Sequence, residues 1–577
     1  MRHPLLSQFQ LIGLAILAVA LPFELKAPLV LLGPIVITNV EAILYALIVL
    51  WLVQVFRTRR MHWSLIHSAV LAWLMVQFGA AILAPVEREA AIKFALRSMG
   101  GVLLFFITAD AVRSSSRAAW IMSAVAIGAV ISAAAGWFEA ESSAAQAALL
   151  IFKTQTTLIG GEVRAGGTFQ YANTAAMYWE AALPIVIATG VYWSTLRVRQ
   201  RWLLRGAALA ASVFLIEAVI LSTSRAALVS MGLALVSMII VDRVSSSRSG
   251  VRRPAAMGLI ALLALFGAEL FINPLFSARL RSESDDSWFR AEIQPMSSQL
   301  SASSGQILTQ SVVVTNTSVR AWPAAGAQAV HVSYHWIQPA SRRVLILDGA
   351  RTLLPHDLAP GEATTLDALV QVPAFTGTLQ LQWDLVQEDV AWFSARGSPA
   401  AAVSVQITPE QSRVQSPLPS DLVTVRSTSS PPRADLWRAG LKMWLNYPLL
   451  GIGPDNFRHV YGSYLGQAEF DDRITANNWY VEVLATVGVV GLIAGLLVVV
   501  TTVIVMRRQW PLLATPQERA LAIGLGVALL TFLMHGTVDY FMEFTPTYGL
   551  LWLCAGLLVG LLTGTHDAGS TGTTDRV

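Results

Sequence analysis

Polar residues gather beside long apolar stretches in three segments of this chain. The segments are 164–173, 222–225 and 433–482, and each begins or ends with an arginine or a glutamate. An arginine at the centre of a membrane costs up to about 3 kcal/mol, so one near the boundary normally has a partner or a function. The planar guanidinium group suits the binding of phosphate oxygens. The plainer alternative for Arg225 is that its side chain reaches up to lipid phosphate.

The longest segment predicts a local structure of its own. Residues 433–446 have the pattern of an amphipathic helix, and the glycine-rich sequence 447–457 predicts a turn after it. A helix that re-enters the membrane is then predicted from about 478. Glu482 would lie about one turn inside that helix, where an unpaired carboxylate is expensive.

Composition identifies the class of protein to which these segments belong. Of the 577 residues, 54% are hydrophobic and 13% are charged, and the mean hydropathy is +0.57. These values exclude a disordered chain, a disulfide-stapled domain and an ordinary soluble enzyme. The net charge of +4 is small and scattered, which argues against nucleic acid as a partner. Cys554 is a single cysteine, so no disulfide framework or thiolate metal cluster is expected.

The apolar stretches predict about twelve transmembrane helices, because each is close to the roughly 20 residues that a span needs. The first is interrupted by Glu24 and Lys26, so it is either one long helix or a helix with a re-entrant tail. The predicted spans are 10–34, 40–56, 64–85, 92–112, 118–137, 171–193, 206–222, 226–241, 255–273, 478–506, 517–538 and 546–563.

Basic residues indicate the direction of these spans. Every second loop is basic, and in the twelve-span arrangement all the basic clusters lie on one side, which is the cytoplasmic side by the positive-inside rule. The clusters are Arg57, Arg59 and Arg60; Arg113 and Arg117; Arg197, Arg199, Arg201 and Arg205; Arg243, Arg248, Arg252 and Arg253; and Arg507 and Arg508. Both termini are then cytoplasmic, and the apolar N-terminus lacks the features of a cleavable signal. The long loops 138–170 and 274–477 face outward, so function is expected on that face.

Within the second outward loop, residues 300–408 change to an alternation of large apolar and polar residues. Roughly seven such segments separated by turn signals predict an antiparallel β-sandwich. Trp336, Trp383 and Trp392 could stack on sugars, although the alternation favours a packed core for the first two. The predicted division of the chain is 1–273 for the N-terminal spans with the loop 138–170, 274–299 for a connector, 300–408 for the sandwich, 409–432 for a Ser/Pro-rich linker, 433–477 for a helical segment of the active site, 478–563 for the C-terminal spans and 564–577 for a cytoplasmic tail.

Two family resemblances follow from these motifs. The sandwich, in particular 332–336, 358–362 and 384–393, resembles a module that accompanies polysaccharide-assembly glycosyltransferases. The membrane part resembles the O-antigen ligase and O-antigen polymerase superfamily, whose members use polyprenyl-diphosphate-linked glycans. The residues that match the superfamily pattern are Arg164, Gly167, Thr168, Phe169, Asn173, Ser224, Arg225, Pro448, Gly451, Gly453, Phe457, Asn478, Tyr480, Glu482, Gly488, Gly491, His535, Asp539 and Pro546.

The resemblance implies a membrane glycosyltransferase that acts on the outward, periplasmic face of the inner membrane. Arg164 and Arg225, with Arg433, would hold the donor diphosphate, and an acceptor hydroxyl would displace it with inversion. His535 or Glu482 would assist proton removal. The residues expected to position the substrates are Asn173, Asp455, Arg458, His459, Asn477, Asn478, Tyr480 and Asp539.

One position departs from the superfamily pattern. Asn477 stands where the family has a histidine, and an asparagine cannot accept a proton at pH 7. His459 and His535 are therefore the candidates for that role. No cluster of Asp and His at metal-ligand spacing appears on the outward side, so a metal-independent enzyme without cofactor is expected.

Several functions remain open at this point. A ligase would move a finished glycan onto a glycan, lipid or protein acceptor, whereas a polymerase would extend a lipid-linked chain, and both would show these motifs. A flippase would be expected to show two repeated halves and charges near mid-membrane. A receptor with a glycan-binding sandwich would need only one or two spans.

Overall fold

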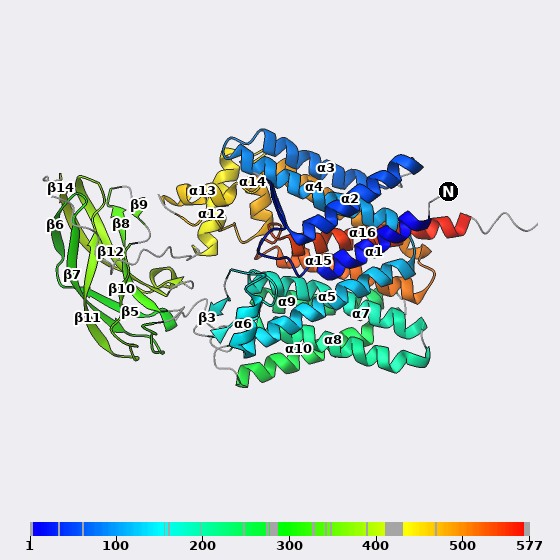
Figure 1. Ribbon diagram of the computed structural model, residues 1–577, viewed down its shortest axis with the longest axis horizontal. Coiled ribbons are helices and arrows are strands. Elements are labelled where there is room, and N and C mark those ends of the chain that lie inside the picture. Colours follow the sequence, from blue (N-terminus) through cyan, green and yellow to red (C-terminus); the bar gives the residue numbers. More distant parts are fainter. Residues whose placement is uncertain are drawn as a thin grey trace, which may run out of the picture.

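The computed structural model shows a helical membrane part with a β-sandwich at one end (Figure 1). The described residues are 4–32, 35–59, 63–154, 156–159, 162–196, 198–245, 249–272, 276, 287–325, 329–340, 343–346, 349–387, 391–409, 431–467 and 470–570. Most of the predicted linker 409–432 and the end of the predicted tail lie outside them, as do Arg60, Arg197 and Arg248.

Eleven helices in the described part of the chain are long and apolar enough to cross a membrane. They are α2 (Asn39–Thr58), α3 (Leu65–Ile82), α4 (Arg88–Ala111), α5 (Ser115–Glu141), α7 (Ala172–Leu196), α8 (Arg201–Leu221), α9 (Arg225–Val244), α10 (Arg252–Ile272), α14 (Trp479–Gln509), α15 (Pro516–His535) and α16 (Thr545–Ser570). The polytopic helical fold predicted from the apolar stretches is thus confirmed.

The predicted first span is shorter than expected. Helix α1 (Pro4–Ala20) ends well before Glu24, and the rest of that apolar stretch forms a hairpin of β1 (Val30–Leu32) and β2 (Ile35–Ile37). The charged residues Glu24 and Lys26 lie in the turn region between them. The structure therefore has eleven membrane-length helices and one short apolar helix among its described residues, rather than twelve full spans.

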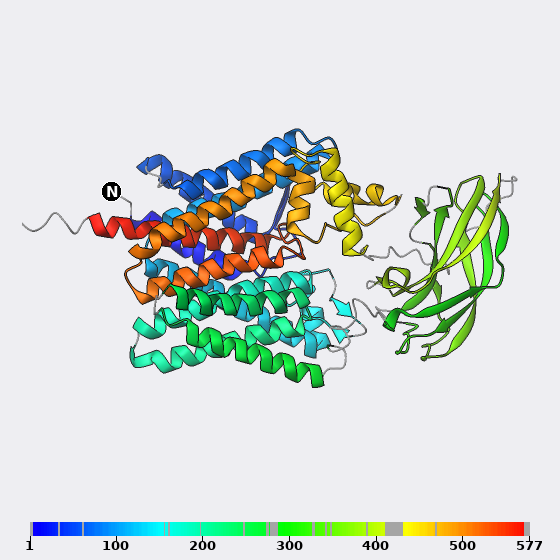
Figure 2. The same ribbon diagram turned by 180° about the vertical axis from the view of Figure 1, so that it is seen from behind.

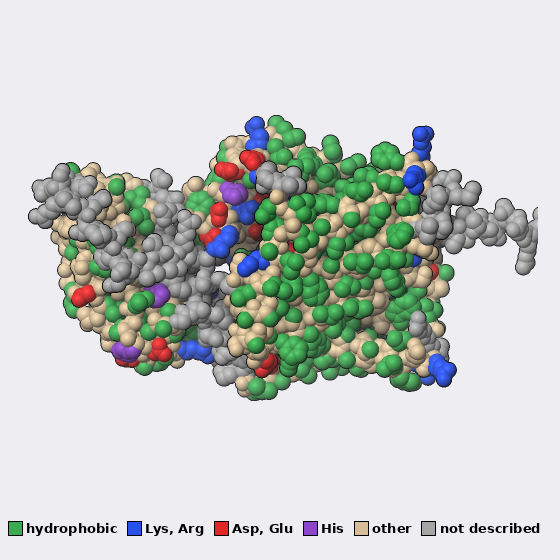
Figure 3. Space-filling view, in the orientation of Figure 1, with side chains coloured by type: hydrophobic (Ala, Val, Ile, Leu, Met, Phe, Trp, Pro, Cys, Tyr) green, Lys and Arg blue, Asp and Glu red, His purple; other side chains and the backbone are tan. Residues whose placement is uncertain are grey.

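The membrane helices form one bundle, and the sandwich stands off one end of it in both views (Figures 1 and 2). Between the two lie the short helices α12 (Arg433–Asn446) and α13 (Phe457–Leu465), drawn in yellow. Helix α6 (Ser143–Leu149) and the two-residue strands β3 (Leu158–Ile159) and β4 (Glu162–Val163) are at the same end. Basic side chains are visible at the opposite end, while the flank between is largely hydrophobic (Figure 3).

The sandwich consists of two sheets packed around an apolar core. One sheet has the order β10-β8-β12-β14-β6, with β13 on β12 and β9 on β8, and the other has the order β11-β7-β5. The strands are β5 (Ala291–Pro295), β6 (Gln299–Ser303), β7 (Ile307–Asn316), β8 (Val330–Gln338), β9 (Arg343–Ile346), β10 (Thr352–Leu353), β11 (Ala363–Gln371), β12 (Gly377–Gln387), β13 (Ala391–Trp392) and β14 (Ala401–Thr408). Ten strands are thus described where the alternation indicated roughly seven, because short edge strands give little alternation to recognise.

The three tryptophans of the sandwich are all buried. Trp336 and Trp383 are fully inside the core, as the alternation favours, and Trp392 is only 2% exposed. Arg351 and His335 also cover the ring of Trp392, at 5.1 Å and 4.3 Å from its centroid. The interpretation of these rings as an exposed sugar-stacking platform is therefore wrong, because each ring is already covered by protein.

Candidate functional site

A buried ion pair holds the loop after α5 against the bundle, at the end nearest the sandwich, which we call the outer end (Figure 1). Lys153 pairs with Glu139 at the outer end of α5, and both side chains are fully buried. The second carboxylate oxygen of Glu139 accepts the backbone N–H groups of Gly166 and Gly167 at 3.0 and 2.8 Å. Gly167 has φ +55°, and a Cβ there would lie 2.6 Å from the Ser132 carbonyl oxygen. The glycines of this motif are therefore needed for close backbone approach.

Arg164 joins this loop to the N-terminus of α9. Its Nε donates to the Ser222 carbonyl oxygen at 2.8 Å, and a terminal nitrogen donates to Oδ1 of Asn173 at 2.7 Å. Arg164 is 8% exposed. Arg164 thus contacts the 222–225 segment at Ser222.

The chain just before α9 is strained. Thr223 has φ +52°, which is costly for a β-branched residue, and its buried hydroxyl has no hydrogen-bond partner among the described residues. Ser224 makes no side-chain cap for α9, whose first residue is the half-buried Arg225. The backbone at a helix N-terminus carries a partial positive charge that attracts anions. An arginine at this position adds a further positive charge at the same place.

A chain of buried polar groups crosses three helices below this point. The hydroxyl of Ser230 on α9 donates to Glu180 on α7, whose other oxygen lies 2.7 Å from Nδ1 of His535 on α15. Nε2 of His535 has no hydrogen-bond partner among the described residues, and Oδ2 of Asp539 lies 3.9 Å from it. His535 is therefore held between the carboxylates of Glu180 and Asp539.

Asp539 is the outermost member of this chain of groups. Its side chain is 18% exposed, whereas Glu180 and His535 are closed to solvent. Burial raises the pKa of Asp539, but the positive charges of His535 and Arg433 outweigh burial and hold its pKa below the usual range. Asp539 is therefore a carboxylate at neutral pH, on the outward side of His535.

The motif at the start of α14 fixes this helix to the end of α15. The side chain of Asn478 caps α14 by accepting the Val481 N–H at 3.0 Å, and it donates to the Thr537 carbonyl at 2.7 Å. Tyr480 donates to the Leu533 carbonyl at 2.8 Å. Because these contacts flank His535, Asn478 and Tyr480 position that residue rather than contact its ring.

The neighbouring motif residues have their own structural contacts. Glu482 is 2% exposed and accepts the Ala476 N–H at 2.8 Å. Asn477, in place of the family histidine, adopts a left-handed conformation with φ +46°. Asn173 accepts a hydrogen bond from Arg164.

Helix α14 is broken at Gly488, and the break is filled by the loop 448–453. Gly488 has φ +71° and ψ −170°, which is accessible essentially only to glycine. The carbonyls freed at Ala485 and Thr486 accept the N–H groups of Ile452 and Gly453 at 3.0 and 2.9 Å. On the other side of the break, Val489 and Val490 donate to the Pro448 and Leu449 carbonyls. Gly488 and the glycines of the loop 448–453 therefore allow one set of backbone hydrogen bonds, between the broken helix and the loop.

A cluster of charges lies next to this loop. Asp455, with φ +68°, accepts a hydrogen bond from Arg458 at 2.6 Å, and Arg458 also lies 3.6 Å from Glu543. Burial raises the pKa of Asp455, and Arg458 opposes that effect. Burial also raises the pKa of Glu543 to about 7, with Arg458 opposing and Asp455 adding to the shift. Nε2 of His459 is buried without a hydrogen-bond partner among the described residues.

These separate groups converge on one region. Asn173 and Glu180 are seven residues apart on α7, so they share a face and lie about 10 Å apart along the axis. Arg225 and Ser230 on α9 are about 7.5 Å apart along theirs. The ring of Tyr171 packs on Phe544 at 5.6 Å, next to Glu543. The loop after Arg164, the start of α9 and the segment after α15 thus surround the outer end of the His535 network.

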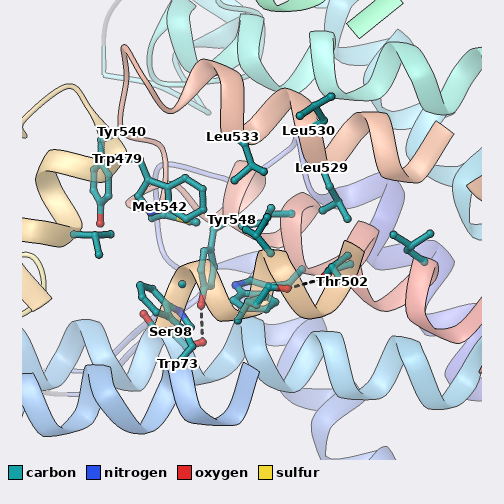
Figure 4. A pocket seen from close by; sticks show the side chains of 18 of the residues that line it. Trp73, Ser98, Trp479, Thr502, Leu529, Leu530, Leu533, Tyr540, Met542 and Tyr548 are labelled. Carbon is teal, nitrogen blue, oxygen red and sulfur yellow. Dashed lines mark hydrogen bonds between the residues drawn. The ribbon is translucent and has the colours of Figure 1, made fainter. Parts of the chain in front are cut away.

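An apolar cavity of about 460 Å³ extends from this region into the bundle. Asp455, Trp479 and Tyr540 line its outer end, and Thr502 and Leu529 line it deeper between α14 and α15 (Figure 4). Tyr548, in the middle, donates to the Ser98 carbonyl at 2.6 Å, so its hydroxyl is already satisfied. A cavity with so few free polar groups suits a hydrocarbon chain.

Sequence reasoning missed several residues of this region. Glu180 was available as the single acidic residue inside the apolar stretch 171–193, where an ionisable residue is by default a functional candidate. Glu139, Lys153 and Glu543 have no spacing that singles them out, because each meets its partners only after the chain folds. No group of three or more His, Cys, Asp or Glu residues that could hold a metal ion occurs in the described ranges.

Comparison of the sequence with known protein families gives a match to one segment of the chain. Residues 390–496, which contain α12, α13 and the first part of α14, match the O-antigen ligase family model. This match confirms the resemblance that the motifs indicate, over that part of the chain. The protein is thus a multi-pass membrane enzyme of the glycosyltransferase type, and it acts in the assembly of cell-surface polysaccharide. No curated protein matches the chain.

Glu180 is a specific target for mutation. We expect Glu180→Gln to lower kcat by about 10²-fold with little change in KM, because the amide keeps the shape but removes the charge that holds His535. Glu217→Gln on α8 is the matched control, since it changes another glutamate inside the bundle. Steady-state kinetics of both purified variants measure this. An unchanged kcat in Glu180→Gln would show that the network only packs the helices.

Proposed function

We propose that this protein transfers a glycan from a polyprenyl-diphosphate donor to an acceptor hydroxyl on the periplasmic face of the inner membrane, as an O-antigen ligase does. The observation that carries the proposal is the contact of Arg164 with the 222–225 segment, at the N-terminus of a membrane helix and above the His535 network. The neighbouring apolar cavity would receive the polyprenyl tail. Both termini would then be cytoplasmic, as the basic clusters indicate.

In this reaction the protein stabilises the charge of the leaving group. Arg164, Arg225 and Arg433 hold the diphosphate, whose bond to the anomeric carbon breaks as the acceptor oxygen attacks from the opposite side. The diphosphate leaves with the bonding electrons, and the configuration of the anomeric carbon is inverted. The arginines supply the positive charge, so no metal ion is required.

The proton of the acceptor hydroxyl needs a base at the outward face. His535 lies between two carboxylates, so Asp539 is the better acceptor. Glu482 is enclosed and bound to the Ala476 N–H, and we assign it to positioning the segment before α14. Asn477 then needs no basic role.

The test is an assay with purified protein. The protein is incubated with a lipid-diphosphate-linked oligosaccharide and candidate acceptors, and the release of lipid diphosphate is followed together with the glycosylated product. Release that depends on an acceptor supports the proposal, whereas transport of the donor without release would contradict it. A product that grows while still attached to lipid would identify a polymerase of the same superfamily instead.

The pKa of Glu543 predicts a pH dependence. Its carboxyl is neutral below about pH 7 and charged above it, and it follows Met542, which lines the apolar cavity. The added negative charge repels an anionic donor, so we expect KM for the donor to rise about 3- to 10-fold as pH increases through 7. The folded protein also holds this proton at pH values where an unfolded chain has lost it, so the contribution of Glu543 to stability falls as the pH rises from about 4.5 to about 7.

The variant Glu543→Gln isolates this effect. It should make KM independent of pH near 7, while kcat keeps its profile. Glu362→Gln on the sandwich is a control, since the pKa of Glu362 is lowered by its hydrogen bond to His356. A KM that rises equally in the wild type and in Glu543→Gln would assign the titration to another group.

A further inference from the structure

A second cavity, of about 560 Å³, lies outside the membrane part, between the sandwich and the helices α12 and α13. We call it the seam. The polar residues that line it and carry the argument are Trp392, Asp435, Arg438, Lys442, Tyr464 and Gln467. Figure 3 shows acidic, basic and histidine side chains gathered between the sandwich and the apolar bundle. The function proposed above does not use this cavity.

Backbone contacts hold the two sides of the seam together. Val344 on β9 donates its N–H to the Gly466 carbonyl at 3.1 Å, and it forms a parallel bridge with Gln467 directly after α13. The sandwich is thus attached to the helical segment at a defined point, and the seam lies beside that attachment.

One face of α12 is built for polar contacts in the seam. Asp435, Arg438 and Lys442 follow a spacing of three and four residues, so they share one face of the helix. Leu436 and Met443, on the other face, pack into the core beneath. The seam also contains two buried polar atoms without a hydrogen-bond partner among the described residues, Nε1 of Trp392 and Oε1 of Gln467.

The composition of the seam selects its ligand. Asp435 and Asp471 balance Arg438 and Lys442, so the cavity carries no excess of either charge that would select a polyanion. Lys442 Nζ donates to the Tyr464 carbonyl oxygen at 3.5 Å, and the half-buried Tyr464 also lines the cavity. Mixed hydrogen-bonding groups next to an aromatic ring match the hydroxyl groups and the apolar faces of sugars, and they do not suit an acyl chain.

The position of the seam also agrees with a glycan. Helix α12 begins at Arg433, whose charge acts on Asp539, and the seam extends along this helix from Asp435 to Lys442, about 10 Å. A sugar chain that leaves the diphosphate site outward would therefore run along α12. We propose that the seam binds the glycan of the lipid-linked donor, beyond the sugar that carries the reacting bond. The identity of this glycan as the donor's rests on the proposed function, whereas the binding of a glycan does not.

The direct test is binding of a free oligosaccharide. The probe is the multi-repeat oligosaccharide released from its lipid diphosphate by mild acid, titrated against the full-length protein in detergent. We expect Lys442→Ala and the double variant Lys442→Ala/Tyr464→Ala to weaken binding at least 10-fold. Lys93→Ala, which removes an exposed lysine paired with Glu89 on α4, should bind as the wild type does. No binding by the wild type, or equal binding by all variants, overturns the proposal.

Transfer kinetics separate this proposal from the proposed function. With a long-glycan donor, the seam variants should raise KM at least 10-fold, and with a single-sugar donor they should transfer as the wild type does. Arg225→Ala should lose transfer but still bind the free oligosaccharide. If the wild type binds the oligosaccharide but transfers no glycan, only the proposed function is rejected. If the seam variants lose transfer equally with the long-glycan and the single-sugar donors, the seam is rejected as a glycan-binding site.

Discussion

We expect Arg225→Ala to lower the rate of glycan transfer by at least about 10²- to 10³-fold, which is the usual cost of removing one group that stabilises charge in a transition state. The half-buried Arg225 is the first residue of α9 and follows the strained Thr223. Without the Arg225 side chain, less positive charge would remain at the helix N-terminus to hold the diphosphate. Release of lipid diphosphate by purified protein measures the loss.

Two further variants make this prediction specific. Arg225→Lys keeps the charge but not the planar fork, so it should recover only part of the rate. Arg252→Ala changes an exposed arginine at the start of α10 and should leave transfer intact. Each protein should insert and elute as the wild type does. Full activity of a well-folded Arg225→Ala protein would remove this residue from the reaction.

Gly488→Ala should have the largest effect on the stability of the membrane part. The conformation at Gly488 costs a residue with a side chain about 1–3 kcal/mol in backbone strain alone. A Cβ there would also lie 2.2 Å from the Leu449 carbonyl oxygen, so the loop 448–453 would have to move. We expect a lower midpoint of thermal unfolding in detergent and a smaller folded fraction on size exclusion.

Gly267→Ala on α10 is the control for this change. No heavy atom lies within 4 Å of a Cβ at that position, and its backbone is helical. Alanine should therefore be neutral or slightly stabilising there. If both variants unfold at the wild-type temperature, the break in α14 does not need a glycine.

The candidate site was predictable only in part. The polar segments pointed to Arg164 and Arg225 because polar residues at the ends of apolar spans are unusual, and the family resemblance pointed to His535. They did not show what each residue does. Asn478 and Tyr480 hold α14 against α15, and Glu482 binds the Ala476 N–H, and none of these contacts can be read from spacing. Glu180, which holds His535, was overlooked inside an apolar run.

Local patterns determined the class of this protein. Apolar stretches of about 20 residues require helices in a membrane and alternation requires strands, because each of these properties depends on residues close together in the chain. Even so, the predicted first span, 10–34, extends beyond the end of helix α1 at Ala20, because hydropathy does not show where a turn begins.

Tertiary structure decided what lies next to what. Glu180 and His535 are 355 residues apart, and the broken α14 is completed by backbone groups from 448–453. The seam combines strands of the sandwich with the helices that follow it. Such contacts satisfy buried charges and unpaired backbone groups, and a sequence shows which groups need partners but not which partners the fold will supply.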